Sequence, residues 1–219
     1  MIPDYLLAAT KATETLIRFG IGSAPISPIP ILKKTPGVLV VSYQSLSEDL
    51  SQDRRCMIDT FGEKNQDAFT SVNLKDGKKL YIVTYNQQLS QVFVQRALAR
   101  ELGHIILGHD GSRPEDVRNE EAKCFANHLL VPRALIHMIQ ASGIRLTEEV
   151  LGSLTGCYHH CLSCMRKIPP VNVSPDLNRL VRDNFKPYFI NFFEFERYAA
   201  RHDGSALADL GTYMDGYEE

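Results

Sequence analysis

The sequence predicts an α+β fold, because three segments with the composition of β-strands come before a series of helical patterns. The strand-like segments are rich in β-branched and aromatic residues. The patterns that follow repeat apolar residues at intervals of three and four. A chain of 219 residues that is 44% hydrophobic and 23% charged can bury a core. We expect a small three-stranded antiparallel sheet packed against a central helix and further helices.

The first expected element is an amphipathic helix over residues 5–19, which Gly20 and Gly22 end. The proline-rich segment 23–30 follows. Because each proline fixes its own φ and lacks a backbone N–H, this segment is expected to be a connector without helix or central strand.

The three strands are expected at residues 38–43, 67–74 and 79–85. Asp76-Gly77 is a hairpin signal between the last two. The helices are expected at residues 92–108, 118–130, 133–141 and 176–201. Between the last two, Thr147 resembles an N-cap that precedes an acidic first turn.

The charge balance argues against direct binding of nucleic acid. The chain has 24 Lys and Arg against 26 Asp and Glu, a net charge of −2, and no long basic run. No stretch approaches the ~18 consecutive apolar residues of a membrane span, and the first residues do not resemble a signal peptide. Five cysteines without an export signal favour reduced thiols. We therefore expect a cytoplasmic protein that does not bind membranes.

The segment from Arg100 to His109, R-E-L-G-H-I-I-L-G-H, differs by one residue from the zinc-peptidase motif H-E-x-x-H. In that motif two histidines one helical turn apart bind the metal and the glutamate activates water. Glu101 and His104 fit the pattern. Arg100 stands at the first ligand position, where a guanidinium has no lone pair to offer a metal. Taken alone, Glu101 and His104 also fit a polar pair at the edge of a core.

A second string, E-E-A-K-C-F-A-N-H-L-L-V-P, begins at Glu120 and ends at Pro132. Together the two strings resemble the ImmA/IrrE family of metallopeptidase-like proteins, whose patterns are A-H-E-L-G-H-I-L-L-G-H and E-x-E-A-x-x-F-A-x-x-L-L-x-P. The resemblance covers about residues 30–135. It implies a zincin-like fold in a domain over residues 1–170, followed by a helical extension and tail over residues 171–219.

The resemblance also implies the roles of individual residues. Glu101 matches the general base, and His104 and Glu121 match two zinc ligands. It implies a hydrolase of a prokaryote, phage or other mobile element that acts on a protein substrate or repressor-type partner.

Arg100 leaves two outcomes open. In the first, its guanidinium replaces the metal and pairs with the carboxylate of Glu121 or Glu101. In the second, another side chain completes the metal site. The candidates are His109, Cys124 and His128.

Geometry permits this substitution. Glu121, Cys124 and His128 lie within about 60° of one another on a helix. His109 follows Gly108, which could end the preceding helix and let the imidazole turn inward. Cys124 and His128 fit equally well as core residues, since free cysteine is among the most buried residue types.

A second cluster of possible metal ligands is Cys157, Cys161 and Cys164, with His159 and His160 between them. The C-x₃-C-x₂-C spacing is that of radical-SAM iron–sulfur loops. With His160 the same thiols could form a structural Cys₃His zinc site. The spacing i, i+4, i+7 also fits one buried stripe of a helix.

Three function classes follow from the sequence. The first is a metallopeptidase acting on a regulatory protein, impaired if Arg100 prevents zinc binding. The second is a non-catalytic regulator that binds a protein in the same cleft without metal. The third, a helix-turn-helix over residues 146–165, is disfavoured by the acidic balance.

Overall fold

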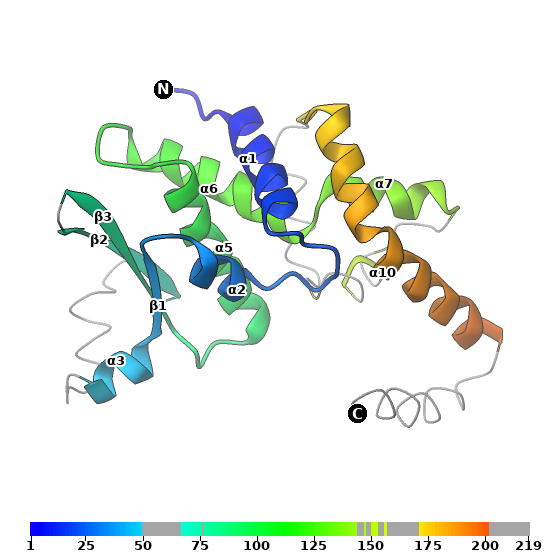
Figure 1. Cartoon of the computed structure of the whole chain (residues 1–219), viewed down its shortest axis with the longest axis horizontal. Helices are drawn as coiled ribbons and strands as arrows, with labels where there is room; N and C mark the ends of the chain where they lie inside the picture. Colours follow the sequence, from blue (N-terminus) through cyan, green and yellow to red (C-terminus); the bar gives the residue numbers. More distant parts are fainter. Residues whose placement is uncertain are drawn as a thin grey trace.

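The computed structural model describes residues 1–49, 67–75, 77–143, 147, 150–152, 156 and 171–201. It is an α+β structure in which a three-stranded sheet lies at one end and helices α7 (Arg133–Ala141) and α10 (Pro175–Arg201) lie at the other (Figure 1). Helices α1 (Tyr5–Arg18), α5 (Gln91–Ile106) and α6 (Glu115–Leu130) lie between them. Within the described ranges no helix is both long and apolar enough to cross a membrane.

The sheet consists of β1 (Val38–Ser42), β2 (Ala68–Lys75) and β3 (Lys78–Tyr85) in the order β1-β3-β2. Strands β2 and β3 pair antiparallel, as the hairpin signal predicts, with Ala68 opposite Tyr85. Strand β1 runs parallel to β3, with Val38 opposite Tyr81, so the expectation of a wholly antiparallel sheet was wrong. The long connection from β1 to β2 explains the difference, because a crossover of a dozen or more residues allows parallel pairing.

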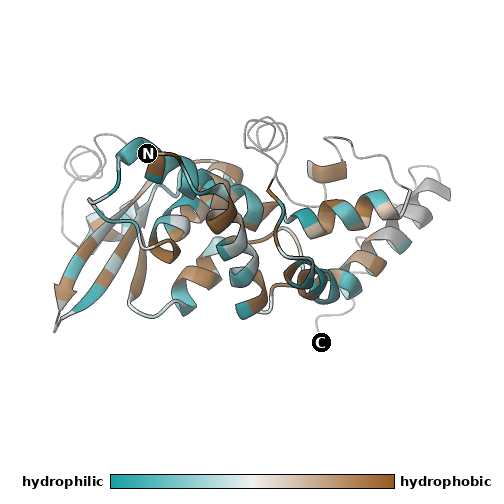
Figure 2. Cartoon of the chain, turned by 90° about the horizontal axis from the view of Figure 1, so that it is seen from above, coloured by the Kyte–Doolittle hydropathy of each residue, from teal (hydrophilic) through white to brown (hydrophobic). Residues whose placement is uncertain are grey.

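Hydrophobic and hydrophilic residues alternate along the strands (Figure 2), as expected for a sheet with one packed face. Val83 and Ala68 are fully buried at the end of the sheet that meets α5. Near the hairpin, Val72 and Leu74 of β2 are exposed.

Two helices differ from the expectation. The short helix α2 (Pro28–Lys34) begins inside the segment expected to be a connector. Proline is tolerated in the first turn of a helix, where a backbone N–H has no intrahelical acceptor, so Pro28 and Pro30 start this helix rather than prevent it. Helix α3 (Tyr43–Asp49) follows β1 directly and begins at Tyr43, which was expected to end the strand.

The other helices agree with their expected positions to within a few residues. The largest difference is at α6, which begins at Glu115 rather than 118, with Glu115 and Asp116 as favourable acidic residues in its first turn. Thr147 accepts a hydrogen bond from the backbone N–H of Val150 at 3.2 Å, which confirms the predicted N-cap. The expected short helices at the cysteines and the helix-turn-helix segment lie largely outside the described residues.

The core is formed where α1 and α5 pack against α6. Helix α1 presents Ala8, Ala9 and Ala12, all fully buried, and such small side chains allow a close approach. Gly103 of α5 does the same, because a Cβ there would lie 3.0 Å from Phe125 of α6. This contact fixes the position of α5 relative to α6, on which the two sequence motifs lie.

Helix α10 contributes to the same core. Val181 and Phe185 are buried, and the helix packs against α1 and α7. The division into a domain of residues 1–170 and an extension of residues 171–219 stays a prediction.

Candidate functional site

Helix α5 places Glu101 and His104 on one face, since residues three apart are neighbours on a helix. The helix ends at Ile106, and Gly108 adopts a φ of 67°, which a residue with a side chain rarely does. The chain turns there, and the N–H of His109 donates to the carbonyl of His104 at 3.0 Å. The turn brings the two imidazoles together, with Nδ1 of His104 and Nδ1 of His109 2.9 Å apart.

Glu101 is buried between α5 and the sheet. Its Oε2 accepts a hydrogen bond from the hydroxyl of Thr70 on β2 at 2.8 Å, and Nε of Arg100 lies 3.7 Å from Oε1. Burial raises the pKa of Glu101 above its usual range, while the Thr70 hydrogen bond and the charge of Arg100 oppose this shift. A carboxyl group with a raised pKa is suited to exchange protons, as a general base must.

Glu121 is the most heavily engaged group of the site. Its Oε1 accepts from Nη2 of Arg113 at 2.8 Å and from the backbone N–H of Asp4 at 2.7 Å. Its Oε2 accepts from Nη1 of Arg113 at 2.8 Å and contacts Nε2 of His109 at 3.0 Å. The residue is 1% exposed. A carboxylate has about four lone-pair sites, so these contacts occupy both oxygens.

The hydrogen-bond pattern assigns the protons of the two histidines. A carboxylate only accepts, so Nε2 of His109 must carry the proton that it shares with Glu121. Burial lowers the pKa of His109, although Glu121 opposes this shift, and the lowered pKa favours a neutral ring. Nδ1 of His109 is then the acceptor and Nδ1 of His104 the donor. Burial, His109 and Arg100 lower the pKa of His104 to about 4, so Nε2 of His104 keeps a free lone pair.

Three of these side chains reach a cavity of about 360 Å³ beside β2. Glu101, His104 and His109 line it together with Phe69, Thr70 and Val72 of the strand. Arg118 of α6 lines it as well. Glu121 lies behind His109 and does not line the cavity.

The other suggested substitute ligands, Cys124 and His128, form no hydrogen bond with the group formed by Glu101, His104, His109 and Glu121. Cys124 is fully buried, with its Sγ 3.6 Å from the carbonyl oxygen of Tyr5, and burial raises its pKa to about 12. A protonated, buried thiol is a poor metal ligand. His128 lines a different cavity, beside Pro132 and Arg133. Cys157, His159, His160, Cys161 and Cys164 lie outside the described residues.

Sequence reasoning missed two side chains of the site, Arg113 and Thr70. Arg113 lies in the loop before α6, and nothing in the local pattern distinguishes it from an exposed loop arginine. Thr70 is an ordinary strand residue. Only the packing of α6 and β2 against α5 brings them to Glu121 and Glu101.

A catalytic zinc ion needs three protein donors around one point and an open position for water. Among the residues that the structure describes, no group of three or more His, Cys, Asp or Glu side chains could hold a metal ion. Both oxygens of Glu121 and both ring nitrogens of His109 are engaged in hydrogen bonds, and Arg100 has no lone pair. Of these residues, only His104 has a lone pair available for a metal, on Nε2. The residues as arranged do not fit a zinc site.

Comparison with protein families gives one match. Residues 52–155 match the family Peptidase_M78, described as the IrrE N-terminal-like domain. The matched segment contains both sequence strings, from Arg100 to His109 and from Glu120 to Pro132. No match was found among curated proteins or among solved structures.

Proposed function

We propose that this chain, whose residues 52–155 match the IrrE N-terminal-like domain of the Peptidase_M78 family, is a metallopeptidase-like protein. It binds a regulatory, repressor-type protein in its cleft without cutting it. The family is generally zinc-dependent. The proposal rests on the contacts of Glu121, the residue that matches a zinc ligand of the family, because they occupy both of its carboxylate oxygens. Its carboxylate is neutralised by Arg113 and shared with His109 and the N–H of Asp4.

The cavity beside β2 suits an extended protein segment. Within the part of the chain that the structure describes, β2 pairs with β3 on one side only and lies at the edge of the sheet. An edge strand can accept another strand through its backbone groups. Val72, 51% exposed, lines the cavity and offers apolar contact beside the polar Glu101 and His104.

The second candidate function is peptidase activity at a repaired zinc site. His109 favours it, since Gly108 turns its ring to within hydrogen-bonding distance of both His104 and Glu121. This function requires Arg113 and Asp4 to release Glu121 and the two imidazoles to exchange their shared proton for a metal.

Elemental analysis of the full chain, purified without a metal-binding tag, separates the two functions. We expect no zinc that depends on Glu121. About one zinc per chain that Glu121→Ala removes would support the peptidase instead. Zinc lost only when Cys157, Cys161 and Cys164 are all changed to serine would be a structural metal and would leave the binding function in place.

Binding in the cleft is tested by peptide display against the immobilised full chain. We expect the selected peptides to bind the parent and to lose affinity for Val72→Glu, which places a charge on the edge beside the cavity. The matched control is Leu39→Glu on β1, the opposite edge of the sheet, where the side chain is 57% exposed. Peptides that distinguish neither variant from the parent would contradict the proposal.

A further inference from the structure

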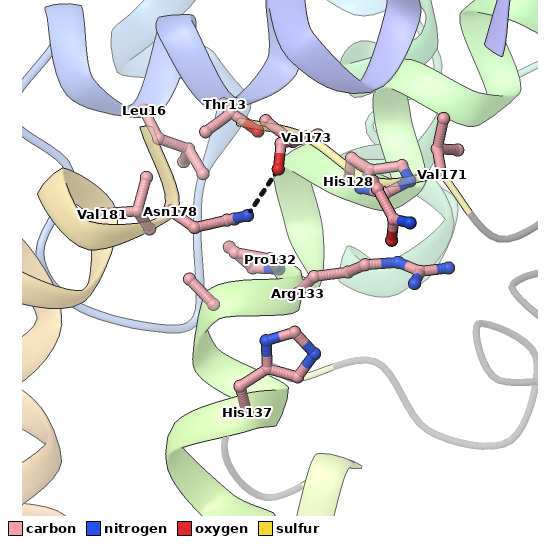
Figure 3. Close-up of a pocket in the computed structure, with 12 residues that line it drawn as sticks. Thr13, Leu16, His128, Pro132, Arg133, His137, Val171, Val173, Asn178 and Val181 are labelled. Carbon is pink, nitrogen blue, oxygen red and sulfur yellow. Dashed lines mark hydrogen bonds between the residues drawn. The ribbon is translucent and has the colours of Figure 1, made fainter. Parts of the chain in front are cut away.

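A second cavity lies at the other end of the described structure, between α1, the end of α6, α7 and the start of α10 (Figure 3). It has an inner part of about 80 Å³ and a more open outer groove of about 470 Å³. The two parts share lining residues, among them His137 and Val173, and therefore adjoin one another. A groove of this size falls in the range of small-molecule sites, about 300–1,000 Å³.

The lining is basic. Arg133 of α7 lines the inner part, Arg182 of α10 lines the outer groove, and His137 lines both. Among the residues that the structure describes, no Asp or Glu side chain lines either part. Helices α7 and α10 both begin at the cavity, at Arg133 and Pro175, so the positive ends of two helix dipoles add to the charge of the arginines.

His128 is the independent observation that points to a ligand. Its side chain belongs to a residue that is 7% exposed, yet it faces the inner part of the cavity (Figure 3). No hydrogen bond joins either ring nitrogen to another residue in the described part of the chain. Neither nitrogen is completely buried, so both remain accessible from the cavity. The ring can therefore donate to, or accept from, a molecule in the cavity.

The wall opposite α7 is held in place by its own hydrogen bond. Nδ2 of Asn178 on α10 donates to the carbonyl of Val173 at 3.1 Å, which fixes the segment that leads into the helix (Figure 3). Val181 and Leu16 complete an apolar floor. The cavity thus combines an apolar floor with a few basic groups along its walls, the usual composition of a small-molecule site.

We infer that this cavity binds a small molecule through a phosphate group. Arg133 and Arg182 come from two different helices, α7 and α10, His128 comes from a third, α6, and His137 lies one turn after Arg133 on α7. A phosphate presents three oxygens to donors in several directions, whereas a carboxylate presents two oxygens in one plane. The site is separate from the cleft beside β2 and does not depend on the function proposed for that cleft.

Calorimetric titration of the full chain with inorganic phosphate tests the inference, with sodium acetate and chloride at equal ionic strength as comparison anions. We expect saturable binding of phosphate and no comparable binding of acetate. Arg133→Gln and Arg182→Gln should each weaken the binding by about tenfold or more, since each removes a charge-assisted hydrogen bond.

The matched control is Arg179→Gln. Arg179 lies on α10, is exposed, pairs with Asp176 and does not line the cavity, so its replacement changes the net charge equally without touching the site. We expect affinity within twofold of the parent. Because Arg182 is exposed, its replacement leaves the core intact even if the Arg133 variant folds poorly.

Nitrogen NMR of the histidine rings provides a second readout, in which phosphate should shift the His128 signals of the parent. Three results would overturn the inference: no saturable binding, equal binding by the arginine variants and the control, or acetate binding as tightly as phosphate.

Discussion

Arg113 holds Glu121 through two parallel contacts of 2.8 Å each, from Nη1 to Oε2 and from Nη2 to Oε1. Arg100, for which the sequence suggested a pair with Glu121 or Glu101, lies against Glu101, with its Nε 3.7 Å from Oε1. The carboxylate that matches a zinc ligand is therefore neutralised by a residue from the loop before α6. The Glu121 carboxylate also links α6 to the start of α1, because it accepts a hydrogen bond from the N–H of Asp4.

Arg113→Gln is expected to lower the free energy of unfolding, because it leaves the carboxylate of Glu121 buried with less compensation. Breaking a fully buried pair costs about 3–5 kcal/mol, and since the Arg113 side chain is 30% exposed we expect about 1–3 kcal/mol. Urea unfolding at neutral pH measures the loss. The control, Lys123→Gln, removes the exposed pair with Glu120 and should cost less than about 1 kcal/mol. Equal losses for both variants would show that the Arg113–Glu121 pair stabilises the fold no more than the exposed Lys123–Glu120 pair does.

The metal-binding capacity of the cleft should depend on Arg113 as well as on Arg100. Arg100→His alone adds an imidazole but leaves Glu121 engaged by the guanidinium, so we expect no zinc. The double variant Arg100→His, Arg113→Gln should bind about one zinc per chain, since three donor side chains then become available.

Elemental analysis checks this in a background with Cys157, Cys161 and Cys164 changed to serine. Zinc binding by the single Arg100→His variant would show that the contacts of Glu121 do not prevent metal binding.

The pH dependence of stability should carry the signature of His128. Burial and then the charge of Arg133 lower its pKa to about 4, from an ordinary value of about 6.5. The unfolded chain then binds more protons between these values. Stability contributed by His128 is complete above about pH 6.5 and is lost as the pH falls toward 4, by about 3 kcal/mol.

Urea unfolding of His128→Gln between pH 4 and 7 should show a flatter dependence than the parent. The control is His137→Gln, which replaces an exposed histidine and should leave the part of the dependence due to His128 in place. A parent and a His128 variant with the same slope would contradict the assignment.

Thr70→Val should raise the pKa of Glu101 further. The Thr70 hydroxyl donates to the charged form of the carboxyl group and lowers its pKa against the effect of burial, so its removal favours the protonated acid. Carbon NMR of the Glu101 carboxyl group as a function of pH measures the change. Ser71→Ala on the same strand is the control, since the next residue points to the other face of the sheet. A fall in the pKa of Glu101 in the Thr70 variant would exclude this role.

Gly22→Ala should destabilise the chain by about 1–3 kcal/mol. A Cβ at this position would overlap the backbone carbonyl oxygen of Asn184 in α10, so one of the two segments must move. Thermal unfolding measures the effect. Gly111→Ala is the matched control, since a Cβ there meets nothing within 4 Å. Unchanged stability of the Gly22 variant would mean that α10 does not rest on this loop.

The local elements of the fold follow from the sequence because their causes are local. Apolar spacing places α1, α5, α7 and α10, the hairpin signal places β2 beside β3, and the N-cap at Thr147 forms as its residue type predicts. Glu101 and His104 share a face of α5 because they are three residues apart, and Gly108 ends that helix because it can adopt a positive φ. The resemblance to the IrrE family could also be recognised from two short strings of residues, and both lie in the segment 52–155 that matches the family Peptidase_M78.

The partners of these residues are decided by tertiary structure. The parallel pairing of β1 with β3 depends on a long connection whose path has no local signal. Arg113 reaches Glu121 across eight residues of loop and helix, and Thr70 reaches Glu101 across thirty-one. A guanidinium or hydroxyl can serve any nearby carboxylate, so residue type alone does not select the pair. Packing of α6 and β2 against α5 makes that choice, because it sets which buried charge each donor must compensate.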